Sequence, residues 1–114
     1  NNGAKDFQLP NNHFLDIITK SKKWDNSKNL MYVVGATKTS YYKKIRNIIP
    51  NNFLLIPGVG SQGGKIKDVI NSSTLTSNNI IINVSRAIIY SSSKLDYLDK
   101  AEEIVDLYNK QIGL

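Results

Sequence analysis

The sequence predicts an α/β fold in which three parallel strands alternate with helices. Three short apolar runs, at about residues 30–36, 53–57 and 80–84, are rich in β-branched and aromatic residues and show little alternation with polar ones. Such runs are typical of parallel strands that are buried on both faces. Between them, apolar residues recur every three or four positions, which is typical of helices. Because neighbouring parallel strands need a crossover of about a dozen residues or more, each strand is expected to be followed by a helix.

Four helices are expected around these strands, one before the first strand and one after each of the three. Their apolar stripes lie at 14–21, 42–49, 66–70 and 98–112. The last stripe is the longest, and Gly113 just beyond it is a typical helix stop. The expected order is therefore a helix followed by three strand–helix units, with no stretch long enough to be an interdomain linker.

Length and composition limit the class of protein. With 114 residues and 12.8 kDa, the chain has room for one domain. It contains no cysteine, which excludes disulfide scaffolds, thiolate zinc sites and thiol nucleophiles. Its longest apolar runs are about five residues, far short of the roughly 20 that span a bilayer, so no membrane partner is expected.

A net charge of +6 and a pI near 9.6 favour an anionic partner, such as nucleic acid or a phosphorylated metabolite. The lysine clusters at 20–23 and 43–44 could contact nucleic acid, but they have few interleaved aromatic side chains. Most cations are lysines scattered along the chain beside many Ile and Asn residues, which is typical of A/T-rich coding sequence and a solvated surface. A basic nucleic-acid-binding module is therefore a disfavoured alternative, and no nucleic-acid partner is expected.

The most informative segment is Pro-Gly-Val-Gly-Ser-Gln-Gly-Gly at 57–64, between a predicted strand and a predicted helix. Its glycines let the backbone approach a ligand closely, and the helix beginning near Lys65 points unpaired N–H groups back at the loop. Together these features predict an anion site at the carboxyl end of the strand. The segment is neither a P-loop, since no Gly-Lys-Ser/Thr follows, nor a confident dinucleotide motif. A glycine-rich turn without a ligand is the alternative.

A second segment, Asn-Val-Ser-Arg-Ala at 83–87, ends the next predicted strand. In a (β/α)8 barrel the loops after the seventh and eighth strands commonly form a phosphate site, and a glycine-rich loop followed by an arginine on the next strand fits that arrangement. Arg86 offers a bidentate fork to a phosphate, although an arginine paired on the surface is the alternative. We therefore expect the glycine bend at 58–64 and Arg86 to meet at the same end of the sheet.

The remaining candidates point to packing or to a solvated surface. His13, the only histidine, has no metal-ligating partner at helical spacing, so no metal site is expected. Trp24 follows an apolar stripe and is expected to pack. The serines at 91–93 lack a histidine base, so no catalytic triad is indicated. The charged residues at 96–103 are expected to form a solvated helix face with i, i+4 pairs.

Four stretches of the sequence carry a family resemblance. The two segments at 54–64 and 82–90 contain Pro-Gly-Val-Gly-Ser-Gln-Gly-Gly and Ser-Arg-Ala-Ile-Ile-Tyr, two motifs that are quite specific at this separation. They resemble the last two strand–loop segments of the orotidine 5′-phosphate decarboxylase family. Residues 30–37 and 44–46 resemble the preceding strand and helix, and 1–8 resemble the segment before those. The similarity therefore covers essentially the whole chain, and it is greatest to a subgroup found in many bacteria.

The resemblance implies a (β/α)8 barrel that works without a cofactor as a cytoplasmic homodimer. The reaction it implies is the decarboxylation of orotidine 5′-phosphate to uridine 5′-phosphate, the last step of UMP synthesis. A complete barrel needs about 250 residues, so this chain is expected to be one partial domain, 1–114, forming the C-terminal half of the barrel. The missing N-terminal half is then an expected partner. Another phosphate-binding barrel enzyme, of the ribulose-phosphate-binding type, is the alternative.

The resemblance also assigns roles to residues in the two segments. Gln62 corresponds to a loop glutamine that closes over the phosphate, and Arg86 to an arginine that binds it. The backbone N–H groups of Ser85 and Arg86 correspond to the phosphate-binding turn, to which Gly60 and Gly63 of the glycine-rich loop are added as phosphate-binding positions. Pro57 corresponds to a residue that lines the pocket near the base. The chain departs from the family at Ser85, where many members have Gly, and at Lys65, where an Asp is common.

The family's catalytic array is absent from this sequence. The resemblance implies an Asp-x-Lys-x-x-Asp motif whose lysine protonates C6 of the base as CO2 leaves, and no such motif occurs among the 114 residues. No catalytic residue is therefore expected in this chain. The chain alone is expected to be inactive.

Overall fold

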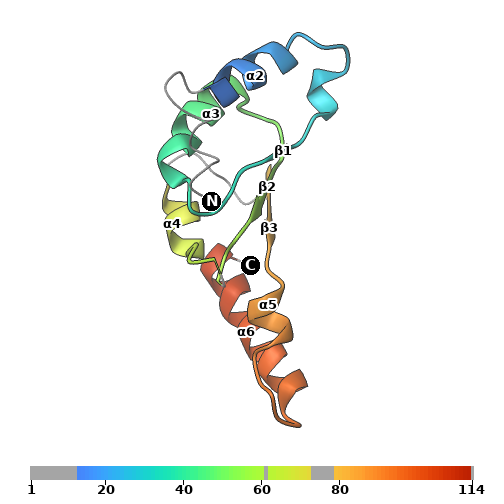
Figure 1. Cartoon of the computed structure of the whole chain (residues 1–114), viewed down its shortest axis with the longest axis vertical. Helices are drawn as coiled ribbons and strands as arrows, with labels where there is room; N and C mark the ends of the chain where they lie inside the picture. The colour runs from blue at the N-terminus through green and yellow to red at the C-terminus, as the bar shows by residue number, and fades with distance from the viewer. Residues whose placement is uncertain (1–12, 61, 73–78, 114) are drawn as a thin grey trace.

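The computed structural model describes residues 13–60, 62–72 and 79–113, and its elements follow the predicted alternation (Figure 1). The segment at 1–8, which carries part of the family resemblance, lies outside the described residues, as does Ser61. In chain order the elements are α2 (His13–Ser21), η1 (Ser27–Asn29), β1 (Tyr32–Val33), η2 (Thr39–Tyr41), α3 (Tyr42–Ile48), β2 (Leu54–Pro57), α4 (Ile66–Asn71), β3 (Ile80–Asn83), α5 (Arg86–Ile89) and α6 (Tyr97–Ile112).

The three strands form one parallel sheet in the order β1–β2–β3, as the sequence predicted. Tyr32 pairs with Leu54, which pairs in turn with Ile80. Strands β2 and β3 have nearly the expected bounds, but β1 is much shorter than the predicted 30–36. Beyond β1 the chain still donates backbone hydrogen bonds to the β2 side, from Val34 to Leu55 and from Ala36 to Pro57. The apolar run therefore lies alongside β2 over most of its length.

One helix, α5, was not predicted by the sequence pattern. It is a single turn that follows directly after β3, where the pattern led us to expect one helix only, at 98–112. Four residues are too few to show a helical period, and α5 has no buried residue that would mark one face. Its position matters because it begins at Arg86.

The core lies between the sheet and the helices on one of its sides. Leu54 and Ile56 of β2 are fully buried there, against the apolar stripe of α3 that ends in Ile45 and Ile49. Figure 1 shows α2, α3 and α4 on this same side of the sheet, with α6 continuing beyond α4. The period-3.6 stripes of the sequence thus mark the faces that pack on the strands.

The opposite side of the sheet is uncovered by any described element, and we call it the open face. Burial alternates along each strand, so that Val33 is 68% exposed and Ile81 is 44% exposed, while their neighbours in sequence point into the core. Leu55, Pro57 and Asn83 share this face by the same alternation. The expectation that the strands are buried on both faces is therefore wrong for the described residues. The reason is that their helices cover only one side.

At the amino end of the strands, Arg46 joins three segments. Its guanidinium donates hydrogen bonds to the carbonyl oxygens of Ile49 (3.2 Å), Asn52 (2.5 Å) and Asn79 (3.0 Å), and also to the Asn79 side-chain oxygen (3.0 Å). Arg46 is only 4% exposed, and this burial lowers its pKa. The residue therefore ties the end of α3 to the turns that lead into β2 and β3.

Candidate functional site

The loops that follow the three strands leave from the same end of the sheet. Pro57, the last residue of β2, pairs in register with Asn83, the last residue of β3. On the other side, Ala36 donates its N–H to the carbonyl of Pro57 at 2.8 Å. The glycine-rich loop and Arg86 therefore begin side by side, at the same end of the sheet, as the sequence predicted.

The glycine-rich loop is folded back on itself. Gly58, Gly60 and Gly63 have φ values of +94°, +78° and +85°, which disfavour residues with a side chain. Three hydrogen bonds close the loop, from Gly63 to the Gly60 carbonyl (2.8 Å), from Gly60 to Gly64 (2.9 Å) and from Gly64 to Gly58 (3.1 Å). Because the N–H groups of Gly60 and Gly63 are used within the loop, in this conformation these glycines shape the site without donating to a ligand.

Gln62 is exposed, and its side chain lies over the start of the loop. Its Oε1 atom would be only 2.8 Å from a Cβ atom placed on Gly58. The amide therefore lies close to Gly58, the residue that follows β2. Asn83, paired with Pro57 and exposed on the open face, is a polar side chain that the sequence analysis did not single out. Its place at a strand end could have been read from the sequence.

Arg86 opens α5 and is exposed. The N–H groups of Ile88 and Ile89 both donate to the Ser85 carbonyl at 2.9 Å, which closes the helical turn. The N–H groups before them belong to the first turn, where a helix has no internal acceptors to offer. The Arg86 guanidinium forms no hydrogen bond or ion pair with another described residue, so the surface-paired alternative is not realised in this part of the chain.

Glycine also allows the three loops to touch. A Cβ atom on Gly60 would lie 2.9 Å from the Ala87 Cβ and 3.1 Å from the Tyr108 hydroxyl oxygen. A Cβ atom on Gly64 would overlap the Cβ of Ala36, in the loop after β1. Beside this contact, towards α6, lies an open pocket of about 450 Å³ whose lining includes Gly60, Lys65 and Tyr108. The glycines thus bring backbone close to the neighbouring elements.

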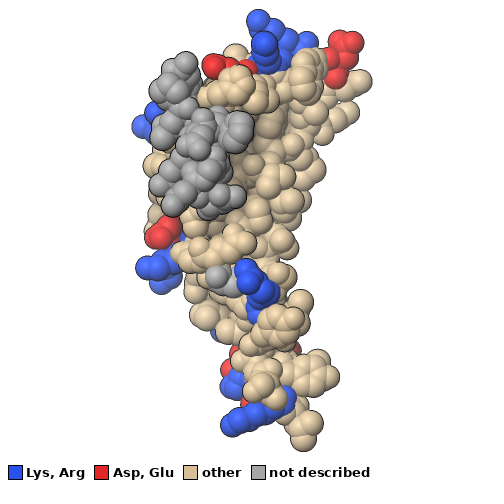
Figure 2. Space-filling view, viewed as in Figure 1, with Lys and Arg blue, Asp and Glu red and all other residues tan. Residues whose placement is uncertain are grey.

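The other sequence candidates lie on the surface. His13 is exposed at the start of α2, and no group of three or more potential metal-ligating side chains occurs among the described residues. Trp24 is 60% exposed, so the expectation that it packs is wrong. Figure 2 shows Lys and Arg side chains at several separate places on one face of the molecule. Within the described ranges, no helix combines the length and apolar character needed to cross a bilayer.

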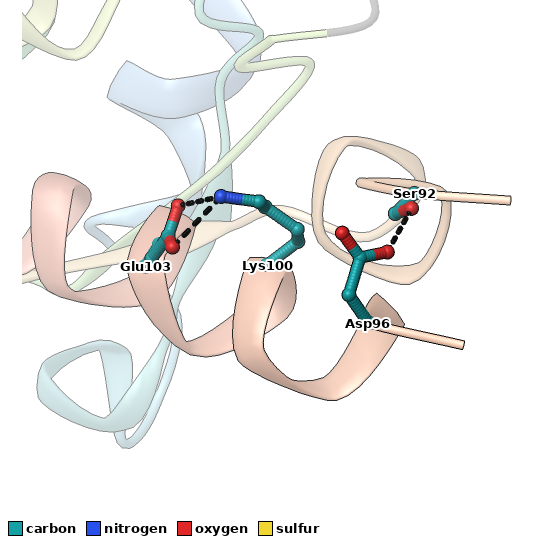
Figure 3. Close-up of polar contacts among 4 residues, drawn as sticks. All are labelled: Ser92, Asp96, Lys100 and Glu103. Atoms are coloured by element: carbon teal, nitrogen blue, oxygen red, sulfur yellow. Dashed lines mark hydrogen bonds and ion pairs between the residues drawn. The ribbon is translucent and has the colours of Figure 1, made fainter. Parts of the chain in front are cut away.

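The charged start of α6 is a solvated surface, as predicted, and Figure 3 shows polar contacts within it. Lys100 forms an ion pair with Glu103 at 2.7 Å, and this contact raises the pKa of Lys100. The spacing is i, i+3, not the expected i, i+4. Ser92, from the serine run, donates a hydrogen bond to Asp96 at 2.6 Å. The Ser92–Asp96 contact links the turn before α6 to the start of that helix, and the ion pair lies within the helix.

Comparison with known proteins places this arrangement in a family. No family model matches the chain. The orotidine 5′-phosphate decarboxylase of Christiangramia forsetii is 47% identical over 117 residues, which cover 99% of this chain and 43% of that protein. The enzyme of the same name from Flavobacterium johnsoniae is 45% identical over 107 residues, covering 90% of this chain and 39% of the relative. The chain belongs to the orotidine 5′-phosphate decarboxylase family.

Solved structures agree with this assignment. The UMP synthase of Leishmania donovani superimposes with a TM-score of 0.74 at 26% identity, covering 98% of this chain and 26% of that one. The OMP decarboxylase of the same organism shows the same fold, with a TM-score of 0.65 at 22% identity over 89% of this chain and 39% of its own. The three parallel strands and their helices thus have the fold of the C-terminal part of a (β/α)8 barrel. The chain spans about two fifths of the length of the curated relatives that it matches.

Proposed function

We propose that this chain forms the phosphate-binding part of an orotidine 5′-phosphate decarboxylase, which converts orotidine 5′-phosphate to uridine 5′-phosphate and CO2. The observation that carries the proposal is the pairing of Pro57 with Asn83, which starts the Gln62 loop and the Arg86 turn at the same end of the sheet. The motifs in both segments resemble those of the last two strand–loop segments of the decarboxylase family. The net charge of +6 suits a substrate with an anionic phosphate.

Each proposed contact follows from the chemistry of the group that makes it. The Arg86 guanidinium, exposed and without a described partner, gives two parallel hydrogen bonds to the phosphate. The backbone N–H groups of Ser85 and Arg86 donate to the same phosphate from the start of α5. The Gln62 amide closes over it from the other loop, while Gly60 and Gly63 hold that loop in its bent shape. Pro57, on the open face, lies towards the base.

The phosphate is remote from the carbon that loses CO2, so this part of the enzyme contributes binding energy. Contacts to a remote group accelerate a reaction when they hold the substrate in the geometry of the transition state. Closure of the Gln62 loop over the phosphate would also shield the site from water. The Asp-x-Lys-x-x-Asp motif, to which the family resemblance assigns the proton transfer, does not occur in these 114 residues. We therefore propose that the chain alone is inactive and is one partial domain.

The missing partner is the rest of the barrel. Val33, Leu55 and Ile81 leave an apolar surface on the open face, and in a closed barrel such residues fill the interior. The unpaired sides of β1 and β3 would meet the remaining strands, which would remove exposed sheet edges. The whole enzyme would be a cytoplasmic homodimer without a cofactor, as the family resemblance implies.

The test places residues 1–114 in a complete barrel, in place of the matching segment of the Christiangramia forsetii enzyme. The chimera should convert orotidine 5′-phosphate. Arg86→Ala should raise KM strongly and lower kcat/KM by about a hundredfold or more, because a bidentate charged contact is lost. Gln62→Ala should act in the same direction, and Lys94→Ala, on the exposed turn before α6, is the matched control.

Two results would refute the proposal. The first is a folded chimera that neither turns over orotidine 5′-phosphate nor binds uridine 5′-phosphate. The second is unchanged kinetics in both Arg86→Ala and Gln62→Ala. Competition by ribose 5-phosphate as strong as that by uridine 5′-phosphate would favour the ribulose-phosphate-binding alternative.

A further inference from the structure

Gly60 is a point at which the glycine-rich loop closely approaches the Arg86 turn. Beyond the pairing of Pro57 with Asn83, no hydrogen bond links the described residues of the two segments. Instead, Gly60 lies against two side chains from other elements. They are Ala87, next to Arg86 on α5, and Tyr108 on α6.

Tyr108 also lines two surface pockets. One is the pocket of about 450 Å³ beside the glycine-rich loop. The other is an apolar pocket of about 140 Å³, lined in part by Ile82 and Ile88 of β3 and α5. The Tyr108 ring is half-buried and packs against the core, while its hydroxyl oxygen would lie 3.1 Å from a Cβ atom on Gly60. The ring fixes the position of the hydroxyl, and the hydroxyl limits where Gly60 can lie.

Movement of Gly60 would be passed on to Gln62. Gly60 accepts a hydrogen bond from Gly63 and donates one to Gly64, so these residues move with it as one closed loop. Gln62 lies inside this loop, and its amide already rests over Gly58. A shift of Gly60 away from Ala87 would therefore separate the Gln62 amide from the Arg86 guanidinium.

We propose that Tyr108 is a positioning residue, which holds Gly60 against Ala87 so that Gln62 and Arg86 converge on one phosphate. This inference rests on the proposed function and deepens it. It assigns to α6, outside both loops, a part in phosphate binding that neither sequence motif contains. Tyr108 touches no substrate. Its contribution is to keep the glycine-rich loop and the Arg86 turn in fixed positions relative to each other.

The experiment compares two substrates in the chimera described above, orotidine 5′-phosphate and orotidine, which lacks the phosphate. Its readout is the ratio of the two kcat/KM values. Tyr108→Ala should lower this ratio roughly tenfold or more, because displacement of a positioning group by about 1 Å can cost as much as a hundredfold. Tyr108→Phe keeps the ring and loses only the hydroxyl, so a smaller fall, of a few-fold, is expected. Tyr97→Phe, at the exposed start of the same helix, is the matched control.

A purely structural role would lower both kcat/KM values together and leave their ratio unchanged. A ratio within about twofold of the parent in both Tyr108 variants overturns the inference and leaves the proposed function intact. If Tyr108→Ala does not fold, Tyr108→Phe decides the question by the same ratio. If the folded chimera without any substitution does not turn over orotidine 5′-phosphate, the proposed function is refuted instead.

Discussion

Individual residues in the two loops are constrained for different physical reasons. At Gly63 the backbone has a positive φ, but a Cβ atom would meet nothing within 4 Å. At Gly64 the φ is ordinary, but a Cβ atom would overlap Ala36. Gly60 combines both constraints. A sequence motif records only that glycine is present, whereas the surroundings show whether conformation, space or both require it.

Tyr42 is a second residue whose surroundings decide its chemistry. It is fully buried at the start of α3, and its hydroxyl donates a hydrogen bond to the Gly35 carbonyl at 3.1 Å. Burial raises the pKa of Tyr42 to about 12, from 10.0 for an exposed tyrosine. The phenol therefore stays protonated in the folded protein at pH values where it ionises in the unfolded chain.

Tyr42 should make the protein lose stability in alkali. Below pH 10 its contribution is complete, and as the pH rises towards 12 the unfolded chain releases a proton that the folded one keeps. The free energy of unfolding should fall by roughly 3 kcal/mol over that window. Urea unfolding of the chimera at a series of pH values measures this, and Tyr42→Phe should flatten the dependence. An equal effect of Tyr97→Phe would show that Tyr42 is not responsible.

At the scale of elements, the loop after β2 contacts its neighbours on its two sides in different ways. Ala36 donates a backbone hydrogen bond to Pro57 and its side chain touches Gly64. The loop after β2 also meets α5 and α6 by packing, and Gly60 lies close to Ala87 and Tyr108 there. The glycine-rich loop is therefore held by a backbone hydrogen bond and packing on one side, and by packing on the other.

Gly64→Ala should test the contact between the loops after β1 and β2. The added methyl group would overlap Ala36 and approach the Gly58 carbonyl to 2.7 Å, so the variant should lose about 1–3 kcal/mol of unfolding free energy in the chimera. Ala36→Gly in the same chain should restore part of this loss, since it removes one of the two close contacts. Gly35→Ala is the control, because a Cβ atom there meets nothing within 4 Å. Equal losses at Gly64 and Gly35 would contradict the packing described here.

At the scale of the whole molecule, the described helices cover only one side of the sheet. Val69 of α4 is fully buried, whereas Val33 on the open face is 68% exposed. Both are apolar, yet only the first is packed by the described part of the chain. The open face has the composition of a protein interior and the exposure of a surface, which is the expected state of strands that belong to a larger barrel.

A polar substitution on the open face should therefore have a context-dependent effect. Ile81→Thr should change the stability of the isolated chain by no more than about 0.5 kcal/mol, as surface changes do, and cost about 1–3 kcal/mol in the chimera, where the barrel interior surrounds it. Val69→Thr, on the covered side, should be costly in both contexts. Denaturant unfolding of the two proteins measures the difference. Equal effects of Ile81→Thr in both would show that the rest of the barrel does not cover this face.

The local patterns of the sequence were enough for the parallel strands, most of the helices and the placement of Gln62 and Arg86 at the same sheet end. The helical connections make the strands parallel, so the ends of successive strands lie at the same edge of the sheet. The turn α5, the one-sided burial of the sheet and the Arg46 network came only from the folded chain. So did the contact of Tyr108 with Gly60. Each of these depends on which distant residues pack together, and periodicity, which compares near neighbours, carries no information about such contacts.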